Sequence, residues 1–204
     1  MKEQIILVGG GGHCHSCIDV IEAGGRFEIA GILDQIKEIG SNVLGYKVIG
    51  RDEKIAEYDP KRYLFLVTVG QIKGAMVRKA LFDRIAEAKA RMPVIVSPYA
   101  VVSKHAQIAD GTVVMHGATV NSQATIGTNT IINSHSLIEH DTRVGSHCHI
   151  ATGAIINGGS QVGDETFVGS GAIVKQGVTI GKRCLISFGS RVGKDIGDDE
   201  VFKS

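Results

Sequence analysis

The chain carries a branched aliphatic residue at every sixth position over almost half of its length. Counting forward in steps of six from Val96 to Val192 gives seventeen positions, and each of them is Ile or Val. Gly often follows these residues directly, as at Gly127 and Gly145. Helices repeat about every 3.6 residues and strands every second residue, so neither element accounts for a period of six. The repeat therefore excludes helical bundles and ordinary sandwiches for this part of the chain.

A unit this short holds one flat strand and one corner, and it buries its branched side chain only when successive turns stack. Three units of six close a coil of eighteen residues. Val120, Ile138, Ile156 and Val174 are then expected to lie above one another as an inward-facing ladder. The period predicts a parallel β-helix, and we assign it to residues 94–204.

The first 93 residues have a different pattern, in which apolar strand-like segments alternate with helical ones. Four consecutive apolar residues, Ile5 to Val8, run into four glycines and then into a helical segment, which is typical of a buried parallel strand and its turn. This alternation predicts a small parallel α/β sheet over residues 1–93, joined to the β-helix at Pro93. We expect strands at 4–9, 29–33, 43–49 and 63–69, and helices at 52–58 and 73–92. A further helix follows the glycine turn, carries Ile18, Val20 and Ile21, and ends at Gly24-Gly25. The helix at 73–92 has helical spacing through Met76, Val77, Ala80, Leu81 and Ile85, with charged residues between them.

The overall composition excludes several classes of protein. A formal net charge of +1 provides no field for nucleic acid or an anionic membrane, and 43% hydrophobic residues suffice for ordinary cores. We see neither a signal peptide nor an apolar run of eighteen residues, and we therefore expect a cytoplasmic protein that does not insert into membranes. Four scattered cysteines, Cys14, Cys17, Cys148 and Cys184, suit reduced thiols better than a disulfide framework.

In parallel α/β sheets, ligands bind beyond the carboxyl ends of the strands. Three candidates fall there: the turn from Gly9 to His13, Asp34, and the pair Gly70-Gln71. Glycines allow close backbone approach and a helix N-terminus favours an anion, so the turn suits a phosphate group. A dinucleotide site is the alternative, although position 14 is Cys where its third glycine belongs.

In the β-helix, His140 is the candidate general base. It lies two residues past the ladder residue Ile138, next to Asp141, and one coil later stands Gly158, which is small enough to leave an imidazole accessible. A carboxylate beside the ring can hold its tautomer and raise its basicity, which general-base catalysis requires.

The chain resembles, over nearly its whole length, the bacterial sugar acetyltransferases of the bacillosamine, perosamine and sialic acid pathways. This resemblance implies an α/β Rossmann-like N-terminal domain followed by a left-handed β-helix. The hand comes from the resemblance, because the period alone does not set it. The motifs that carry the resemblance are VGGGGH at 8–13, Leu33-Asp34, Val69-Gly70, NSHSLIEHD at 133–141 and HIATGA at 149–154.

The resemblance also implies roles for individual residues. His140 falls on the family's base, Asp141 on its acidic partner, and Gly158 on the residue whose backbone N–H stabilises the oxyanion. Acetyl-CoA is the implied cosubstrate, no metal is needed, and the partners are a nucleotide-linked amino sugar and two further copies of the chain, in a homotrimer with active sites between subunits. The implied substrate-binding residues are Gly11, Gly12, His13, Asp34, Gly70 and, at the reacting sugar end, Asn133; the implied cofactor-binding residues are His149, Gly153 and Gly171.

Transfer of acetyl from acetyl-CoA to a sugar amine is therefore the first functional hypothesis. Transfer to a sialic acid hydroxyl is the nearest alternative, because the same base serves both reactions. A non-catalytic scaffold that binds a nucleotide sugar is another, since relatives continue through a Gly-x-Pro-Ala segment near the CoA adenine and this sequence stops at Ser204.

Metal-dependent alternatives need ligands that converge on one ion. A γ-type carbonic anhydrase site would require three such histidines, yet His116 and His140 are 24 residues apart and so fall on different prism faces. His13 and His15 stand beside Cys14 and Cys17, but residues packed this closely at a helix start seldom reach a common ion.

Overall fold

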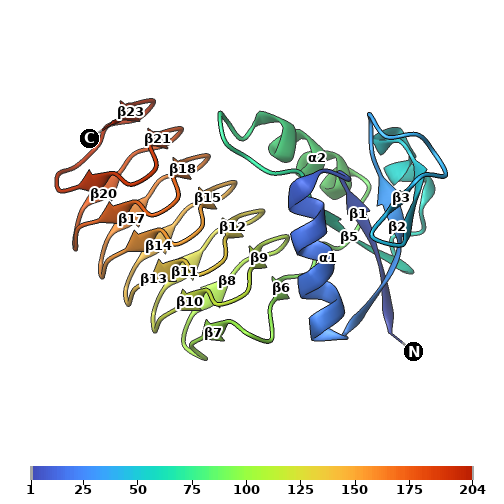
Figure 1. Cartoon of the computed structure of the whole chain (residues 1–204), viewed down its shortest axis with the longest axis horizontal. Coiled ribbons are helices and arrows are strands. Elements are labelled where there is room, and N and C mark those ends of the chain that lie inside the picture. The colour runs from blue at the N-terminus through green and yellow to red at the C-terminus, as the bar shows by residue number, and fades with distance from the viewer. Residues whose placement is uncertain (1, 204) are drawn as a thin grey trace.

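The computed structural model describes residues 2–203, which form two parts that lie side by side. A five-stranded sheet with two α-helices makes up the N-terminal part, and a stack of short strands makes up the rest (Figure 1). The last N-terminal helix ends at Glu87 and the first strand of the stack begins at Ile95. We keep residues 1–93 and 94–204 as the proposed domains.

The N-terminal sheet is parallel except at one edge, with strand order β3-β4-β2-β1-β5. Its central strand β1 is fully buried from Ile5 to Val8 because both faces of the sheet are covered. Ile5 and Leu7 pack in one cluster with helix α1, while Ile6 and Val8 pack in another with helix α2. The strands are β1 (Glu3–Val8), β2 (Phe27–Leu33), β3 (Asn42–Val43), β4 (Tyr46–Gly50) and β5 (Tyr63–Val67).

The predicted strand at 43–49 is wrong in one respect, because it is a hairpin. Leu44 and Gly45 both have positive φ, 47° and 90°, and they reverse the chain between β3 and β4. Two residues with positive φ are the geometry of the tight hairpin turns that match strand twist. The sequence did not predict this turn, because leucine seldom adopts positive φ.

The helices occur near their predicted positions, but the buried face predicted for the helix at 73–92 is partly wrong. Helix α1 spans Gly12–Gly24 and ends at Gly25, and the segment at 52–58 is a 3-10 helix, Asp52–Glu57. Helix α2, Met76–Glu87, buries Leu81 and Ile85 as its pattern predicts. However, Met76 is 79% exposed and Arg78 is only 1% exposed. The first turn of α2 therefore directs a cation inward.

The C-terminal part is a parallel β-helix with three flat faces. We number the faces 1 to 3 and name each corner by the two faces it joins: Asn133 to Ser136 belongs to corner 1–2, Glu139 to Thr142 to corner 2–3, and Gly145 to Cys148 to corner 3–1. Face 1 contains β6 (Ile95–Val96), β9 (Val113–Val114), β12 (Ile131–Ile132), β15 (His149–Ile150), β18 (Phe167–Val168), β21 (Leu185–Ile186) and β23 (Val201–Phe202). Face 2 contains β7 (Val101–Val102), β10 (Thr119–Val120), β13 (Leu137–Ile138), β16 (Ile155–Ile156), β19 (Ile173–Val174) and β22 (Arg191–Val192). Face 3 contains β8 (Gln107–Ile108), β11 (Thr125–Ile126), β14 (Arg143–Val144), β17 (Gln161–Val162) and β20 (Thr179–Ile180).

The predicted register of the β-helix is confirmed. Val120 pairs with Ile138, Ile138 with Ile156, and Ile156 with Val174, each in parallel and eighteen residues apart. All four are fully buried in one core that runs along the prism. Two-residue strands bury little by themselves, so this continuous core is what holds the coils together.

Corner 3–1 shows how closely the coils approach each other. A Cβ added at Gly145 would lie 2.7 Å from the backbone N of Asp164 in the next coil, so only glycine fits. Beside it, the Thr130 hydroxyl donates to the Gly145 carbonyl at 2.9 Å, and the Cys148 thiol donates to the Gly163 carbonyl at 3.1 Å. Cys148 thus takes the place of a threonine in an internal hydrogen-bonded column.

The two parts share a continuous interior. Outward side chains of face 1, such as Val113 and Ile131, belong to the same buried cluster as Ile18 and Ile21 of α1. Helix α1 therefore lies between the sheet and the first coils of the β-helix (Figure 1). Among residues 2–203, no helix is long and apolar enough to cross a membrane.

We expect Ile126→Ala, in β11, to lower the free energy of unfolding by about 2–4 kcal/mol, because it leaves a cavity in the closed core. Its neighbour Thr125 points outward from the same strand, so Thr125→Ala should change this quantity by less than about 1 kcal/mol. Urea unfolding at one fixed protein concentration makes the comparison. Equal losses from both substitutions would contradict the assigned register.

Candidate active site

Corner 2–3 holds a histidine and carboxylate pair with a defined tautomer. His140 Nδ1 lies 2.8 Å from Asp141 Oδ2, and both side chains are more than half exposed. The carboxylate only accepts, so Nδ1 carries the proton and Nε2 is left with a free lone pair. The hydrogen bond that His140 donates to Asp141 raises the pKa of His140. Asp141 adopts φ +58°, a conformation that Asp tolerates better than most residues.

Gly158 lies directly against the His140 ring, one coil further on. A Cβ at this position would come within 2.8 Å of both Cε1 and Nε2 of His140. The Gly158 N–H has no hydrogen-bond partner within residues 2–203, since the neighbouring bonds run from Asn157 N to Val174 O and from Gly159 N to His140 O. The structure thus brings together the three predicted catalytic residues, with a bare donor beside the base.

A cavity of about 970 Å³ lies between the N-terminal sheet and corner 1–2. All six predicted substrate-binding residues line this cavity, and so does the predicted cofactor-binding residue His149. The lining comprises Gly9, Gly11, Gly12, His13, Ser16, Asp34, Ile36, Val69, Gly70, Gln71, Ile72, Lys73, Asn133, Ser134, His149 and Thr152.

His149 and Asn133 are held in fixed orientations in the cavity wall. His149 Nδ1 lies 2.6 Å from the Gln71 carbonyl oxygen, which only accepts, so this nitrogen carries the proton. Nε2 therefore accepts from Asn133 Nδ2 at 3.0 Å. Burial lowers the pKa of His149 to about 4, so the ring is neutral at physiological pH. Both ring nitrogens are occupied within the chain, which leaves the ring carbons to contact a ligand.

Two predicted nucleotide contacts on the N-terminal side have further structural duties. Asp34 accepts three backbone N–H bonds, from Gly10 at 2.6 Å, Ile36 at 2.8 Å and Lys37 at 2.7 Å. Partial burial raises its pKa, but these donors outweigh that effect and lower it overall. The carboxylate thus ties the glycine turn to the segment after β2, with limited capacity left for a ligand.

His13 stands at the first turn of α1, where its Nε2 lies 3.5 Å from Cys17 Sγ. Burial lowers the pKa of His13 to about 3, so this imidazole is also neutral. Its ring centroid is 6.4 Å from that of His149. Two neutral imidazoles therefore line one wall of the cavity, and neither adds charge to it.

Sequence reasoning named Gln71 as a candidate but did not predict the burial of its side chain, and it missed Arg78 altogether. The Gln71 side chain is 2% exposed and neither of its amide atoms has a hydrogen-bond partner in the described part of the chain. Arg78 is buried behind the cavity wall. The helical pattern of 73–92 placed its charged residues on the solvent side, and no local signal in the sequence separates Arg78 from the exposed Arg84.

The predicted site is divided between two corners of the prism. His140, Asp141 and Gly158 lie at corner 2–3, whereas the cavity opens at corner 1–2, and the whole of face 2 separates them. None of the three catalytic candidates lines the cavity. One chain therefore presents a candidate base without an adjacent cavity, and a cavity without a candidate base.

Corners 1–2 and 2–3 share a further feature in the coils that follow His140 in the sequence. At the third turn position, where φ is positive, both carry glycines whose Cβ would meet nothing within 4 Å. Corner 3–1 carries side chains at the same position with the same φ, so the backbone alone does not demand glycine there. The bare edges are Gly153, Gly171 and Gly189 at corner 1–2 and Gly159 and Gly177 at corner 2–3, against His147, Glu165 and Arg183 at corner 3–1.

The metal-dependent alternatives require a cluster of side chains that can bind one metal ion. Within residues 2–203, no group of three or more His, Cys, Asp or Glu side chains is placed to hold a metal ion. Cys14 and Cys17 are buried in the core beneath α1, while His15 is exposed.

Comparison with known proteins identifies both parts of the chain. Residues 4–85 match the PglD N-terminal domain, and residues 159–194 match the bacterial transferase hexapeptide (six repeats). Among curated protein sequences, none matches the chain significantly.

Solved structures match nearly the whole chain. A histidine variant of perosamine N-acetyltransferase from Caulobacter crescentus, in complex with CoA and GDP-perosamine, is 30% identical with a TM-score of 0.91, covering 97% of this chain and 92% of that one. The acetyltransferase domain of PglB from Neisseria gonorrhoeae FA1090, in complex with acetyl coenzyme A, is 27% identical with a TM-score of 0.90, covering 98% and 96%. WeeI from Acinetobacter baumannii AYE, 19% identical with a TM-score of 0.85 over 97% and 94%, shares the fold.

The similar structures confirm the predicted fold class, an α/β domain followed by a left-handed hexapeptide β-helix, and they identify the protein as an acetyltransferase. The chain belongs to the PglD-type family of sugar N-acetyltransferases, as its motifs predict.

We expect Asp141→Asn to lower the pKa of His140, because the neutral amide no longer stabilises the imidazolium. Asn also tolerates the positive φ at this position, so the backbone should not change. An NMR titration of the His140 ring protons measures the effect. An unchanged pKa would show that Asp141 does not interact with the ring in solution.

We expect Gly158→Ala to reduce kcat for acetyl transfer by about 10- to 100-fold, because its methyl group displaces the His140 ring. The matched control is Gly193→Ala, near the same corner, where φ is ordinary and a Cβ meets nothing within 4 Å. Steady-state kinetics of both variants, with melting temperatures as a check on folding, make the test. Equal kcat values for the two variants would refute the assigned ring position.

Proposed function

We propose that the protein transfers the acetyl group of acetyl-CoA to the amino group of a nucleotide-linked amino sugar during the synthesis of a surface glycan. The observation that carries this proposal is the pairing of His140 with Asp141 beside the bare N–H of Gly158. The similar structures support the substrate class, since they were solved with CoA and GDP-perosamine or with acetyl coenzyme A.

In the proposed reaction, the sugar amine attacks the thioester carbonyl and a C–N bond forms. His140 Nε2 accepts the proton that the amine loses, and Asp141 stabilises the resulting imidazolium. The Gly158 N–H donates to the tetrahedral oxyanion, a contribution of roughly 3–4 kcal/mol where such a donor is fixed in place. The C–S bond then breaks, and the CoA thiolate takes the proton back from the imidazolium.

The active site in this proposal requires a second subunit. Face 2 supports this, because four of its six outward residues, Val101, Leu137, Ile155 and Ile173, form an apolar stripe interrupted by Thr119 and ended by Arg191, whereas the outward residues of face 3 are all polar. If three copies surround an axis with face 2 inward, corner 1–2 of each copy meets corner 2–3 of the next. The cavity of one subunit then faces the base of its neighbour. The outward residues of face 3 are Gln107, Thr125, Arg143, Gln161 and Thr179.

The same arrangement offers a path for the cosubstrate. Two bare glycine edges would face each other above His140, and together they would leave a channel along the prism for the extended arm of acetyl-CoA. Gly153 and Gly171 are the predicted contacts on one side, and Gly159 and Gly177 complete the other. No bound metal takes part in these steps.

On the acceptor side, the proposal places the nucleotide in the N-terminal domain. The uncapped first turn of α1, after Gly11, favours the phosphates, and the cavity reaches from there to Asn133. Holding the nucleotide fixes the amine against the thioester, and this proximity accelerates the reaction. We place the protein in the cytoplasm, where its four unpaired and buried cysteines remain reduced.

The proposal predicts that the protein releases free CoA from acetyl-CoA in the presence of one UDP- or GDP-linked 4-amino sugar. His140→Ala should remove this activity, and sialic acid should not support it. Measured thiol release across such a panel makes the test. Turnover on sialic acid alone would favour O-acetylation, and sugar binding without any turnover would favour the scaffold.

The proposed interface predicts that Ile155→Lys on face 2 produces monomers and abolishes acetyl transfer, although it alters neither the cavity nor His140. Sedimentation velocity and the CoA release assay measure both effects. Thr125→Lys on face 3 is the control and should remain a trimer. An active Ile155→Lys monomer would contradict a site shared between subunits.

A further inference from the structure

Arg78 is a buried cation without an acidic partner. Its side chain is only 1% exposed, and no carboxylate forms a salt bridge with it in residues 2–203. Burial lowers the pKa of Arg78 only to about 10, so the guanidinium stays charged at neutral pH. A buried charge destabilises a fold unless hydrogen bonds compensate it. Nε of Arg78 has no hydrogen-bond partner among the described residues, so the compensation comes from Nη1 and Nη2.

The guanidinium joins helix α2 to the end of β5 and to a distant corner of the β-helix. Nη1 donates to the carbonyls of Val67 at 3.1 Å and Val69 at 2.5 Å, both beyond or at the end of β5. Nη2 donates across the domain boundary to the carbonyl of Asn129 at 3.1 Å and to its side-chain Oδ1 at 2.7 Å. The planar fork of Arg suits such paired acceptors, whereas Lys offers no comparable geometry.

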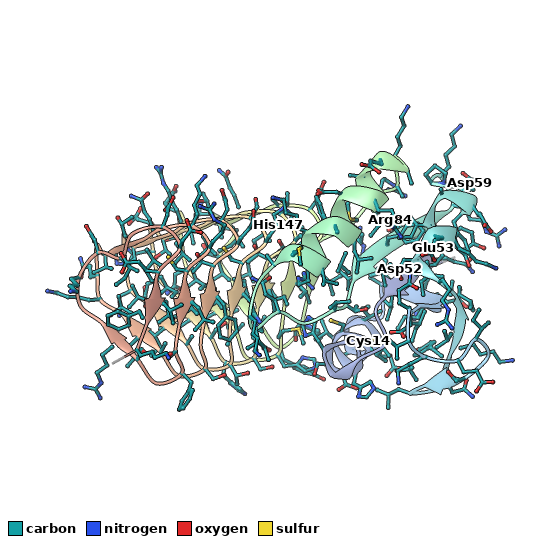
Figure 2. The ribbon with its side chains drawn as sticks, turned by 90° about the horizontal axis from the view of Figure 1, so that it is seen from above. Cys14, Asp52, Glu53, Asp59, Arg84 and His147 are labelled. Atoms are coloured by element: carbon teal, nitrogen blue, oxygen red, sulfur yellow. The ribbon has the colours of Figure 1, made fainter. Side chains whose placement is uncertain are left out.

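Asn129 is built to receive these bonds. It is fully buried at corner 3–1 with φ +51°, and its Nδ2 donates back to the Arg78 carbonyl at 3.2 Å. The same amide group lies 3.0 Å from His147 Nδ1. Figure 2 shows His147 where α2 meets the β-helix, so the bonds between Arg78 and Asn129 lie at the boundary between the two parts.

The segment that Arg78 holds is a wall of the cavity. Val69, Gly70 and Gln71 all line it, and the Gln71 carbonyl lies two residues beyond the carbonyl that Arg78 binds. The Gln71 carbonyl accepts a hydrogen bond from His149 Nδ1, and His149 Nε2 accepts one from Asn133 Nδ2. A continuous chain of short contacts therefore runs from the buried guanidinium to the amide that faces the acceptor sugar.

The charge on Arg78 also suits the state in which His149 is held. His149 accepts a hydrogen bond from Asn133 only while its Nε2 is unprotonated. Burial keeps the ring neutral, and the nearby guanidinium acts in the same direction. The other groups that face the ring are His13 of α1, itself neutral, and Phe167 of the next coil.

We propose that Arg78 and Asn129 form a clasp that positions the segment Val69–Gln71, and through it His149 and Asn133, for binding of the acceptor sugar. Arg78 is thus a positioning residue, since it touches neither substrate. This inference rests on the proposed function for its kinetic consequence. Its structural consequence, the orientation of His149, needs no substrate.

The test compares Arg78→Met and Arg78→Lys with Lys79→Met. Lys79 is the adjacent residue of α2 and forms an ion pair with Glu165 at 2.8 Å, so it also links the two parts, but it does not reach the cavity wall. We expect Arg78→Met to raise KM for the amino sugar by about tenfold and KM for acetyl-CoA by less than about twofold. Arg78→Lys should recover part of this loss, and Lys79→Met should change neither constant.

The independent readout is the tautomer of His149, observed by NMR of protein with ¹⁵N-labelled histidine. In the unaltered protein, Nδ1 should carry the proton throughout the neutral range, whereas in Arg78→Met the ring should exchange between tautomers. If Arg78→Met does not fold, Asn129→Gly decides the question, because Gly keeps the positive φ and removes the side-chain amide that bonds Arg78 and His147, while the Asn129 carbonyl contact remains. Like Arg78→Met, Asn129→Gly should raise KM for the amino sugar and allow His149 to exchange between tautomers.

An unaltered His149 signal and an unaltered sugar KM in folded Arg78→Lys and Asn129→Gly would overturn the inference. Equal effects from Lys79→Met would also overturn it, because they would reduce Arg78 to a general link between domains. Failure of the proposed function would look different: no variant would show turnover, while the His149 signal would still report on the clasp.

Discussion

The stacking of one branched side chain per hexad is the constraint on which the rest of the structure depends. The ladder of Val120, Ile138, Ile156 and Val174 fixes an eighteen-residue coil, and glycines such as Gly145 let neighbouring coils approach closely. Because every coil repeats the same corner, a residue's number sets both its height and its edge on the prism. His140 and Gly158 meet for this reason, and His140 and Asn133 cannot.

The division of the site follows from this geometry. The N-terminal domain packs on face 1 and so builds its cavity at corner 1–2, while the proposed base, His140, lies at corner 2–3. Face 2, which lies between them, carries the apolar stripe, so the surface suited to association is the surface that separates the half-sites. Assembly and catalysis thus rest on the same strands in this account.

Much of the fold was predictable from the sequence because its signals are periodic. The six-residue period yields the register of the β-helix, and the alternation in residues 1–93 yields the α/β sheet. The hairpin at Leu44 escaped because its turn uses a residue that rarely has positive φ. The buried face of α2 was misjudged at Arg78, whose partners are backbone carbonyls and Asn129, 51 residues away. Contacts of that kind leave no mark on local spacing. Motif resemblance located the candidate site residues. It did not show that the polar atoms of Asp34 and His149 form hydrogen bonds within the chain.

The most direct test of the central claim is complementation between two inactive variants. His140→Ala lacks the base but keeps its cavity, and Asn133→Ala lacks a cavity contact but keeps its base. If each site takes its cavity from one subunit and its base from the next, trimers reassembled from an equal mixture should recover about a quarter of the unaltered activity, because a quarter of the interfaces pair two intact halves. Activity no greater than that of the separate variants would contradict a site shared between subunits.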